Sequence, residues 1–108
     1  MDNFYKTEYS KKFDELRENR VKVSFHKYGS VKDNFGLRLT NGIKNMELCI
    51  SKYEKTHNTE YLLDAANYLM FEYMYPQYDD AYFKATDSKD SAGIVGGCMK
   101  EIEEFGTL

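Results

Sequence analysis

Apolar residues recur at intervals of three and four along most of the chain, which is the spacing of one helix face. The spacing predicts four helices, over Thr7–Arg20, Asn41–Lys55, Glu60–Tyr75 and Ser91–Phe105. The second and third are joined by only a few residues, which indicates an antiparallel helical hairpin.

The segment 60–75 is apolar around most of its circumference, so we expect a helix that packs on more than one side. One ridge at strict four-residue spacing is polar enough to face solvent, and consists of Glu60, Asp64, Tyr68 and Glu72. Pro76 should end this helix, because proline lacks an N–H donor and pushes the residue before it out of helical geometry.

Between residues 21 and 26 the apolar period changes to two, because Val21, Val23 and Phe25 alternate with polar residues as in a half-buried strand. A lone strand needs a partner, either residues 35–39 as a hairpin or a strand from a second copy or a target. The predicted fold is therefore mainly α with a minor β element: a compact four-helix domain, 1–108, with one short strand or hairpin near residues 21–39.

The last predicted helix contains Gly93, Gly96 and Gly97, and each interior glycine costs about 1 kcal/mol relative to alanine. We expect these glycines to let another helix approach closely. The alternative is a segment that contacts a ligand or opens transiently.

The charges of the two halves differ in sign. Residues 1–53 hold eleven Lys/Arg and seven Asp/Glu, hence +4, whereas residues 54–108 hold four and eleven, hence −7, which sums to the net −3 of the chain. We expect the two halves to pack together and partly neutralise each other, with two binding surfaces of opposite sign as the alternative. The longest uncharged run, Ser91–Met99, is too short to span a membrane.

The sequence shows no recognisable catalytic or metal-binding pattern. His26 and His57 lie far apart, and neither Cys49 nor Cys98 has a second ligand at the spacing of a zinc site. We therefore expect no enzyme, no cofactor, no metal, and free thiols in a cytoplasmic protein. An enzyme using the turn 86–91 is a minor alternative, since this turn can equally be a helix cap.

Two surfaces are candidates for binding. Tyrosines and carboxylates together suit a protein–protein interface, and we expect one formed by Glu60, Asp64, Tyr68, Glu72, Tyr75, Tyr78, Asp79, Asp80 and Tyr82. Basic and aromatic residues together can instead contact phosphates and stack on bases of a nucleic acid or nucleotide. That alternative surface consists of Lys22, Phe25, His26, Lys27, Tyr28 and Lys32.

The stretch Asn58–Pro76, with its apolar helix and Tyr-Pro stop, is followed by Ala85-Thr86-Asp87-Ser88. This combination resembles a group of small, functionally unassigned proteins encoded by tailed bacteriophages and prophages. The resemblance implies a mobile element in a bacterial cytoplasm, where small phage proteins bind and disable host machinery. We therefore expect a non-enzymatic inhibitor of a bacterial protein or ribonucleoprotein complex, such as a CRISPR effector, with a homodimer as a further alternative.

Overall fold

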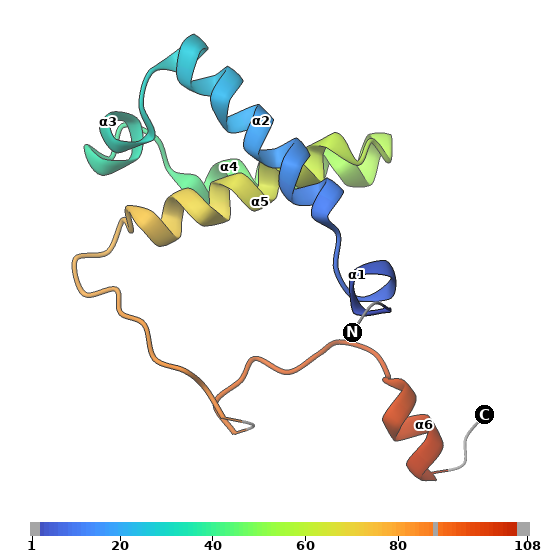
Figure 1. Cartoon of the computed structure of the whole chain (residues 1–108). Helices are drawn as coiled ribbons and strands as arrows, with labels where there is room; N and C mark the ends of the chain where they lie inside the picture. Colours follow the sequence, from blue (N-terminus) through green and yellow to red (C-terminus); the bar gives the residue numbers. More distant parts are fainter. Residues whose placement is uncertain (1–2, 88, 106–108) are drawn as a thin grey trace.

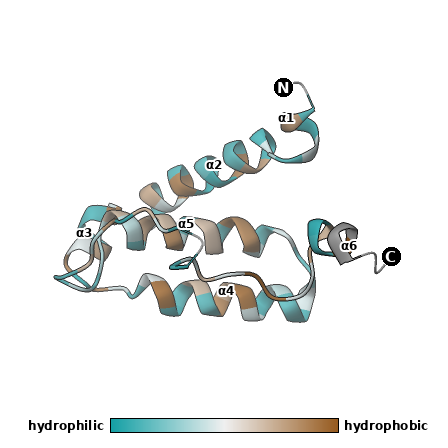
Figure 2. Cartoon of the chain, turned by 90° about the horizontal axis from the view of Figure 1, so that it is seen from below, coloured by the Kyte–Doolittle hydropathy of each residue, from teal (hydrophilic) through white to brown (hydrophobic). Residues whose placement is uncertain are grey.

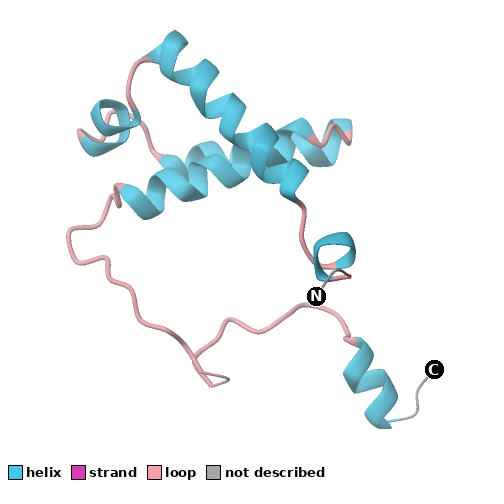
Figure 3. Ribbon diagram, in the orientation of Figure 1, coloured by secondary structure: helices cyan, strands magenta, loops and turns pink. Residues whose placement is uncertain are grey.

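The structure of the chain is a computed structural model that describes residues 3–87 and 89–105. These residues contain helices and loops and no strand (Figure 3), so the prediction of a mainly α fold is confirmed. The helices are α1 Phe4–Thr7, α2 Lys11–Tyr28, α3 Val31–Gly36, α4 Gly42–Thr56, α5 Glu60–Met74 and α6 Met99–Phe105.

Helix α2 continues eight residues beyond the predicted end at Arg20, so the strand predicted at residues 21–26 is wrong. The Ser10 hydroxyl caps its start by accepting a hydrogen bond from the Phe13 amide (3.0 Å). Val21 and Phe25 lie four residues apart and therefore also share one helix face, which turns toward α5. The helix ends at Gly29, whose φ of +88° favours glycine.

Helix α3 lies within the segment predicted to form a hairpin and includes Phe35 and Gly36, so the hairpin with residues 35–39 is also wrong. The Ser30 hydroxyl accepts a hydrogen bond from the Asp33 amide (3.0 Å) and starts this short helix. After it, the left-handed backbone of Arg38 (φ +58°) turns the chain toward α4.

The predicted helical hairpin is confirmed as α4 and α5. Asn41 caps α4 through its side-chain oxygen, which accepts from the Lys44 amide (3.0 Å), and His57 in left-handed geometry makes the connection. Helix α5 ends where Pro76 was expected to end it. The two helices approach closely at Gly42, where an added Cβ would lie 3.1 Å from the Tyr68 carbonyl oxygen.

Helix α5 lies between its neighbours: α4 runs alongside it, and α2 crosses its other side (Figures 1 and 2). The buried apolar residues are few, namely Phe35, Ala65 and Phe71, and two of the three belong to α5. The central position of α5 agrees with its apolar circumference.

Residues 77–98, called the arm below, leave the helices and lead to α6 (Figure 1). The predicted last helix therefore starts at Met99 instead of Ser91. Gly93, Gly96 and Gly97 lie in the arm, and an added Cβ at any of them would meet nothing within 4 Å. The expected close helix packing at these glycines is wrong, and Gly42 has that role instead.

The expected compactness does not hold for the whole chain. Its radius of gyration is 17.4 Å, whereas a compact chain of this length has about 13 Å. Its accessible surface is 9,329 Å², whereas a monomer of 12.7 kDa exposes about 6,200 Å². The surplus of about 3,100 Å² shows that much side-chain surface is left uncovered.

Candidate functional site

The predicted solvent ridge of α5 is largely covered, and α2 covers its first part. Arg20 donates to both carboxylate oxygens of Asp64 (2.6 and 3.0 Å), and its third guanidinium nitrogen lies 3.2 Å from a Glu60 oxygen. Of the four ridge residues only Glu60 is exposed, so the expectation of a wet ridge is wrong. The physical reason in this part of the ridge is Arg20 of α2, which pairs with both Glu60 and Asp64.

The next two ridge residues pack inside the molecule. The Tyr68 ring centroid lies 6.1 Å from that of Phe35 in α3 and 6.0 Å from that of Phe71. The Glu72 carboxylate accepts a hydrogen bond from the Gln77 amide (3.0 Å) and so fixes the start of the arm. These residues hold helices together and present little surface to a partner.

The remaining residues of the predicted protein interface follow α5. Tyr75 is half-buried, with its ring near Gly36, and Asp79 forms an ion pair with Arg38. Tyr78, Asp80 and Tyr82 are exposed. The nine predicted residues therefore form two groups, one that packs α5 against its neighbours and one that lies in the first part of the arm.

The six residues of the alternative nucleic-acid surface do not share one face. Those at positions 22–28 lie on helix α2, where Lys22 and Lys27 differ by about 140° around the axis. Lys22 pairs with Glu18 (3.4 Å), the Lys27 ammonium lies 5.1 Å from the Tyr28 ring centroid, and the His26 ring meets Phe25 edge-on. Lys32 lies on α3. The strand that would have aligned these residues is absent from the described chain.

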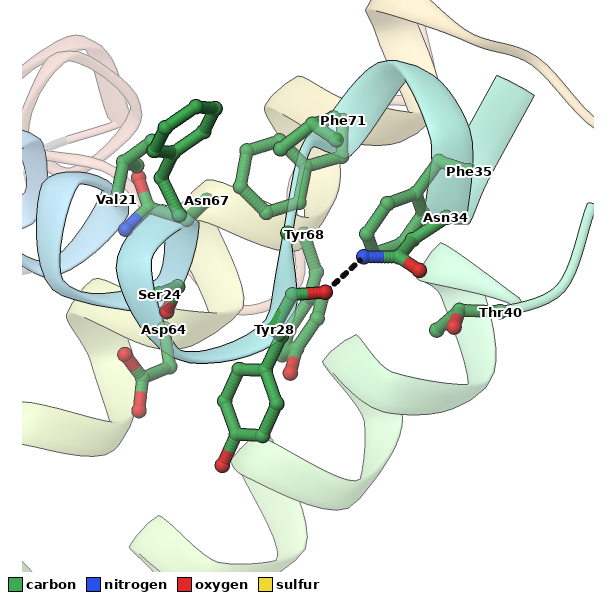
Figure 4. A pocket seen from close by; sticks show the side chains of 13 residues that line it. Val21, Ser24, Tyr28, Asn34, Phe35, Thr40, Asp64, Asn67, Tyr68 and Phe71 are labelled. Carbon is green, nitrogen blue, oxygen red and sulfur yellow. Dashed lines mark hydrogen bonds between the residues drawn. The ribbon is translucent and has the colours of Figure 1, made fainter. Parts of the chain in front are cut away.

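A hollow of about 350 Å³ lies between α2, α3 and α5 (Figure 4). Each helix presents residues at helical spacing to it. The lining residues are Val21, Ser24, Phe25, Tyr28, Gly29, Val31, Asn34, Phe35, Thr40, Asp64, Asn67, Tyr68 and Phe71. Five of them carry aromatic rings, and the hollow combines these apolar walls with a few polar groups.

Asn67 is the polar group most enclosed by the helices, with 5% of its surface exposed. Its side-chain nitrogen donates to the Arg17 carbonyl oxygen of α2 (2.9 Å), which fixes the orientation of the amide. Its Oδ1 atom is buried and has no hydrogen-bond partner among the described residues. Asn67 was not among the predicted site residues, although a single amide within an apolar helix is a signal that could have identified it.

Tyr68, which lines the hollow, and Cys49 of α4 are held in their neutral form. Burial raises the pKa of the Tyr68 hydroxyl and the pKa of the Cys49 thiol, and the Asp64 charge adds to both shifts. Reactive cysteines need a lowered pKa, because the thiolate is the nucleophile. Cys49 therefore has the properties of a packing residue.

No group of three or more His, Cys, Asp or Glu side chains close enough to hold a metal ion occurs in residues 3–87 and 89–105. In the turn 86–91, one Asp87 carboxylate oxygen accepts hydrogen bonds from the amides of Lys89 (2.8 Å) and Asp90 (3.2 Å). This carboxylate thus stabilises its own turn.

Comparisons of the chain with protein families, with curated proteins and with solved structures gave no match. Among the helices of the described residues, none has the length and apolar character that crossing a membrane requires.

Proposed function

We propose that this chain is a non-enzymatic protein-binding inhibitor, which acts by burying its arm on a partner. The observation that supports the proposal best is the surplus of about 3,100 Å² of accessible surface. A standard protein–protein interface buries only about 800 Å² on each partner. The chain as a whole therefore offers more than enough uncovered area for a stable complex.

The chemistry of the arm suits such an interface. Tyr78, Tyr82 and Phe83 are 67%, 84% and 80% exposed, and large rings are the residues that most often dominate binding energy. Asp79 and Asp80 lie between the first two rings and would favour a basic partner surface. Covering the exposed apolar groups of this segment with a partner would lower the free energy of the complex.

The biological setting of the proposal depends on the sequence resemblance alone. On that basis the partner is a bacterial protein or ribonucleoprotein complex of host defence or nucleic-acid processing, such as a CRISPR effector. The protein would then block its partner in the host cytoplasm without catalysing a reaction.

The test is inhibition of purified host effector nucleases by the wild-type chain and by a Tyr82→Ala/Phe83→Ala variant. Both replaced rings are exposed, so the variant should keep its fold while inhibition falls at least about tenfold, as expected for the loss of two interface anchors. A Val23→Ala/Leu48→Ala variant is the matched control, because it removes exposed apolar side chains from α2 and α4 instead. Equal inhibition by all three proteins would exclude the arm as the binding surface.

A further inference from the structure

The hollow between α2, α3 and α5 has the composition of a small-molecule site. We propose that it binds a planar heteroaromatic compound that carries an N–H donor and no negative charge. Its volume of about 350 Å³ lies at the small end of the range for ligand sites. This site is separate from the arm and does not depend on the proposed function.

The walls of the hollow favour a flat ring. Phe35 and Phe71 lie against each other (ring centroids 5.0 Å apart), and Tyr68 extends this aromatic wall. Phe25 and Tyr28 of α2 line the hollow as well, and both are largely exposed. Aromatic rings attract other rings in edge-to-face or offset arrangements, so a planar ligand would find partners on several sides.

The unpartnered Oδ1 atom of Asn67 favours a ligand that donates a hydrogen bond. Asn67 lines the hollow, and its other amide atom is already bonded to the Arg17 carbonyl, so the amide cannot rotate without losing that bond. A buried acceptor without a donor is costly, which makes a donor on the ligand favourable there. Because Oδ1 has less than 1 Å² of accessible surface, a ligand can bond to it only when a neighbouring side chain moves, and the exposed Phe25 and Tyr28 line the same hollow.

The charges around the hollow disfavour anionic ligands. Asp64 lines the hollow, and none of the lining residues is a lysine, arginine or histidine. The Asp64 charge is matched by Arg20, but Glu60 shares the same guanidinium, so the three groups together carry one negative charge. A nucleotide phosphate would therefore be repelled, whereas a neutral ring such as indole would not.

The first experiment is titration of the wild-type chain with indole, observed by NMR. We expect chemical-shift changes confined to residues of the hollow. 1-Methylindole keeps the ring and lacks the N–H donor, so it should bind about fivefold to tenfold more weakly, the value of one hydrogen bond. Indole-3-acetate adds a negative charge and should bind more weakly still.

Two variants test the location of the site. Ser24→Leu fills the hollow from α2, and Asn67→Leu removes the acceptor; each should weaken indole binding at least about fivefold. Leu48→Ala is the control, because this side chain is exposed on α4 and outside the hollow. If Asn67→Leu does not fold, Ser24→Leu and the two indoles still decide the question.

Three results would each overturn the proposal. They are no binding of indole, equal binding of indole and 1-methylindole, and unchanged binding by folded Ser24→Leu. Equal binding of the two indoles would mean that bound water, and no ligand donor, satisfies Asn67. Because none of these measurements involves the arm, their failure would leave the proposed inhibitor function untouched.

Discussion

The helices over 11–74 and the arm over 77–98 both contain many large apolar and aromatic side chains, but among the described residues only the helices bury any of them. In the helices the rings of Phe35, Tyr68 and Phe71 meet one another, because helical spacing brings them to common faces. In the arm Tyr82 and Phe83 are exposed, since no regular backbone aligns them with a second surface. A high content of rings therefore does not by itself predict burial: rings are buried where helices bring them against a second surface, while Phe25 and Tyr28 of α2 are still largely exposed.

The comparison is tested most strongly by removing one ring from each region. Phe71→Ala should lower the free energy of unfolding by about 3–5 kcal/mol, because this ring is 7% exposed and packs against Phe35. Phe83→Ala should change it by less than about 0.5 kcal/mol. Urea denaturation measures both, and similar losses in the two variants would show that the arm is packed in solution.

A second test of the comparison replaces one glycine in the helices and one in the arm. Gly42→Ala should lower the free energy of unfolding by about 1–3 kcal/mol, because the new Cβ would lie 3.1 Å from the Tyr68 carbonyl oxygen. Gly97→Ala in the arm meets no atom within 4 Å and should be neutral or stabilising by up to about 1 kcal/mol. The same denaturation experiment applies, and a harmless Gly42→Ala would mean that α4 and α5 lie further apart than described.

The free energy of unfolding should depend on pH through Tyr68, whose ring is packed among the helices. Burial raises the pKa of Tyr68 above its ordinary value of 10.0, so the folded state holds this proton more tightly than the unfolded state. The resulting contribution to stability is complete below pH 10 and is lost as the pH rises through the higher folded value. Tyr68→Phe should therefore lose less stability than the wild-type chain between pH 8 and pH 11. Parallel pH curves, measured by denaturation at each pH, would argue against this burial.

The smallest effect is expected from removing most of the arm. A chain that ends at Asp80 keeps the ion pair of Asp79 with Arg38 and all helices from α1 to α5. Its thermal midpoint should stay within about 3 °C of that of the whole chain, equivalent to about 0.5 kcal/mol. Calorimetry provides the comparison, and a fall of 10 °C would show that residues beyond 80 stabilise the helices.

The sequence predicted best where several local signals agree. The hairpin of α4 and α5 has apolar residues at helical spacing, a capping residue at Asn41 and a proline stop at Pro76, and all of these are present in the structure. The prediction for residues 21–26 was wrong because the segment fits both patterns. Val21, Val23 and Phe25 have the spacing of a strand, while Val21, Ser24 and Phe25 have the spacing of a helix. Packing of α2 against α5 decides between the two, and the local periodicity of the segment does not show that packing.

The candidate sites were harder to predict for a related reason. Because α5 is apolar on most sides, its sequence does not tell which neighbour covers the ridge of Glu60 and Asp64, and Arg20 lies forty residues away in the chain from the nearer acid. The exposure of Tyr78 and Tyr82 agrees with the predicted partner surface, whose function is still a prediction. The hollow depends on three helices, and one of them, α3, was not among the predicted helices.

Two hydrogen bonds fix Gln77 to the helices and so determine where the arm begins. Its amide is bonded to Glu72 and its side chain donates to Asn41 (3.0 Å), so the arm starts from a fixed point on the helices. From there residues 78–98 can extend at most about 70–75 Å, which exceeds the 53 Å length of the described molecule. The arm thus connects α6 covalently to the helices. If a partner binds the arm, the connection would keep α6 at a high effective concentration near that partner and favour a second contact.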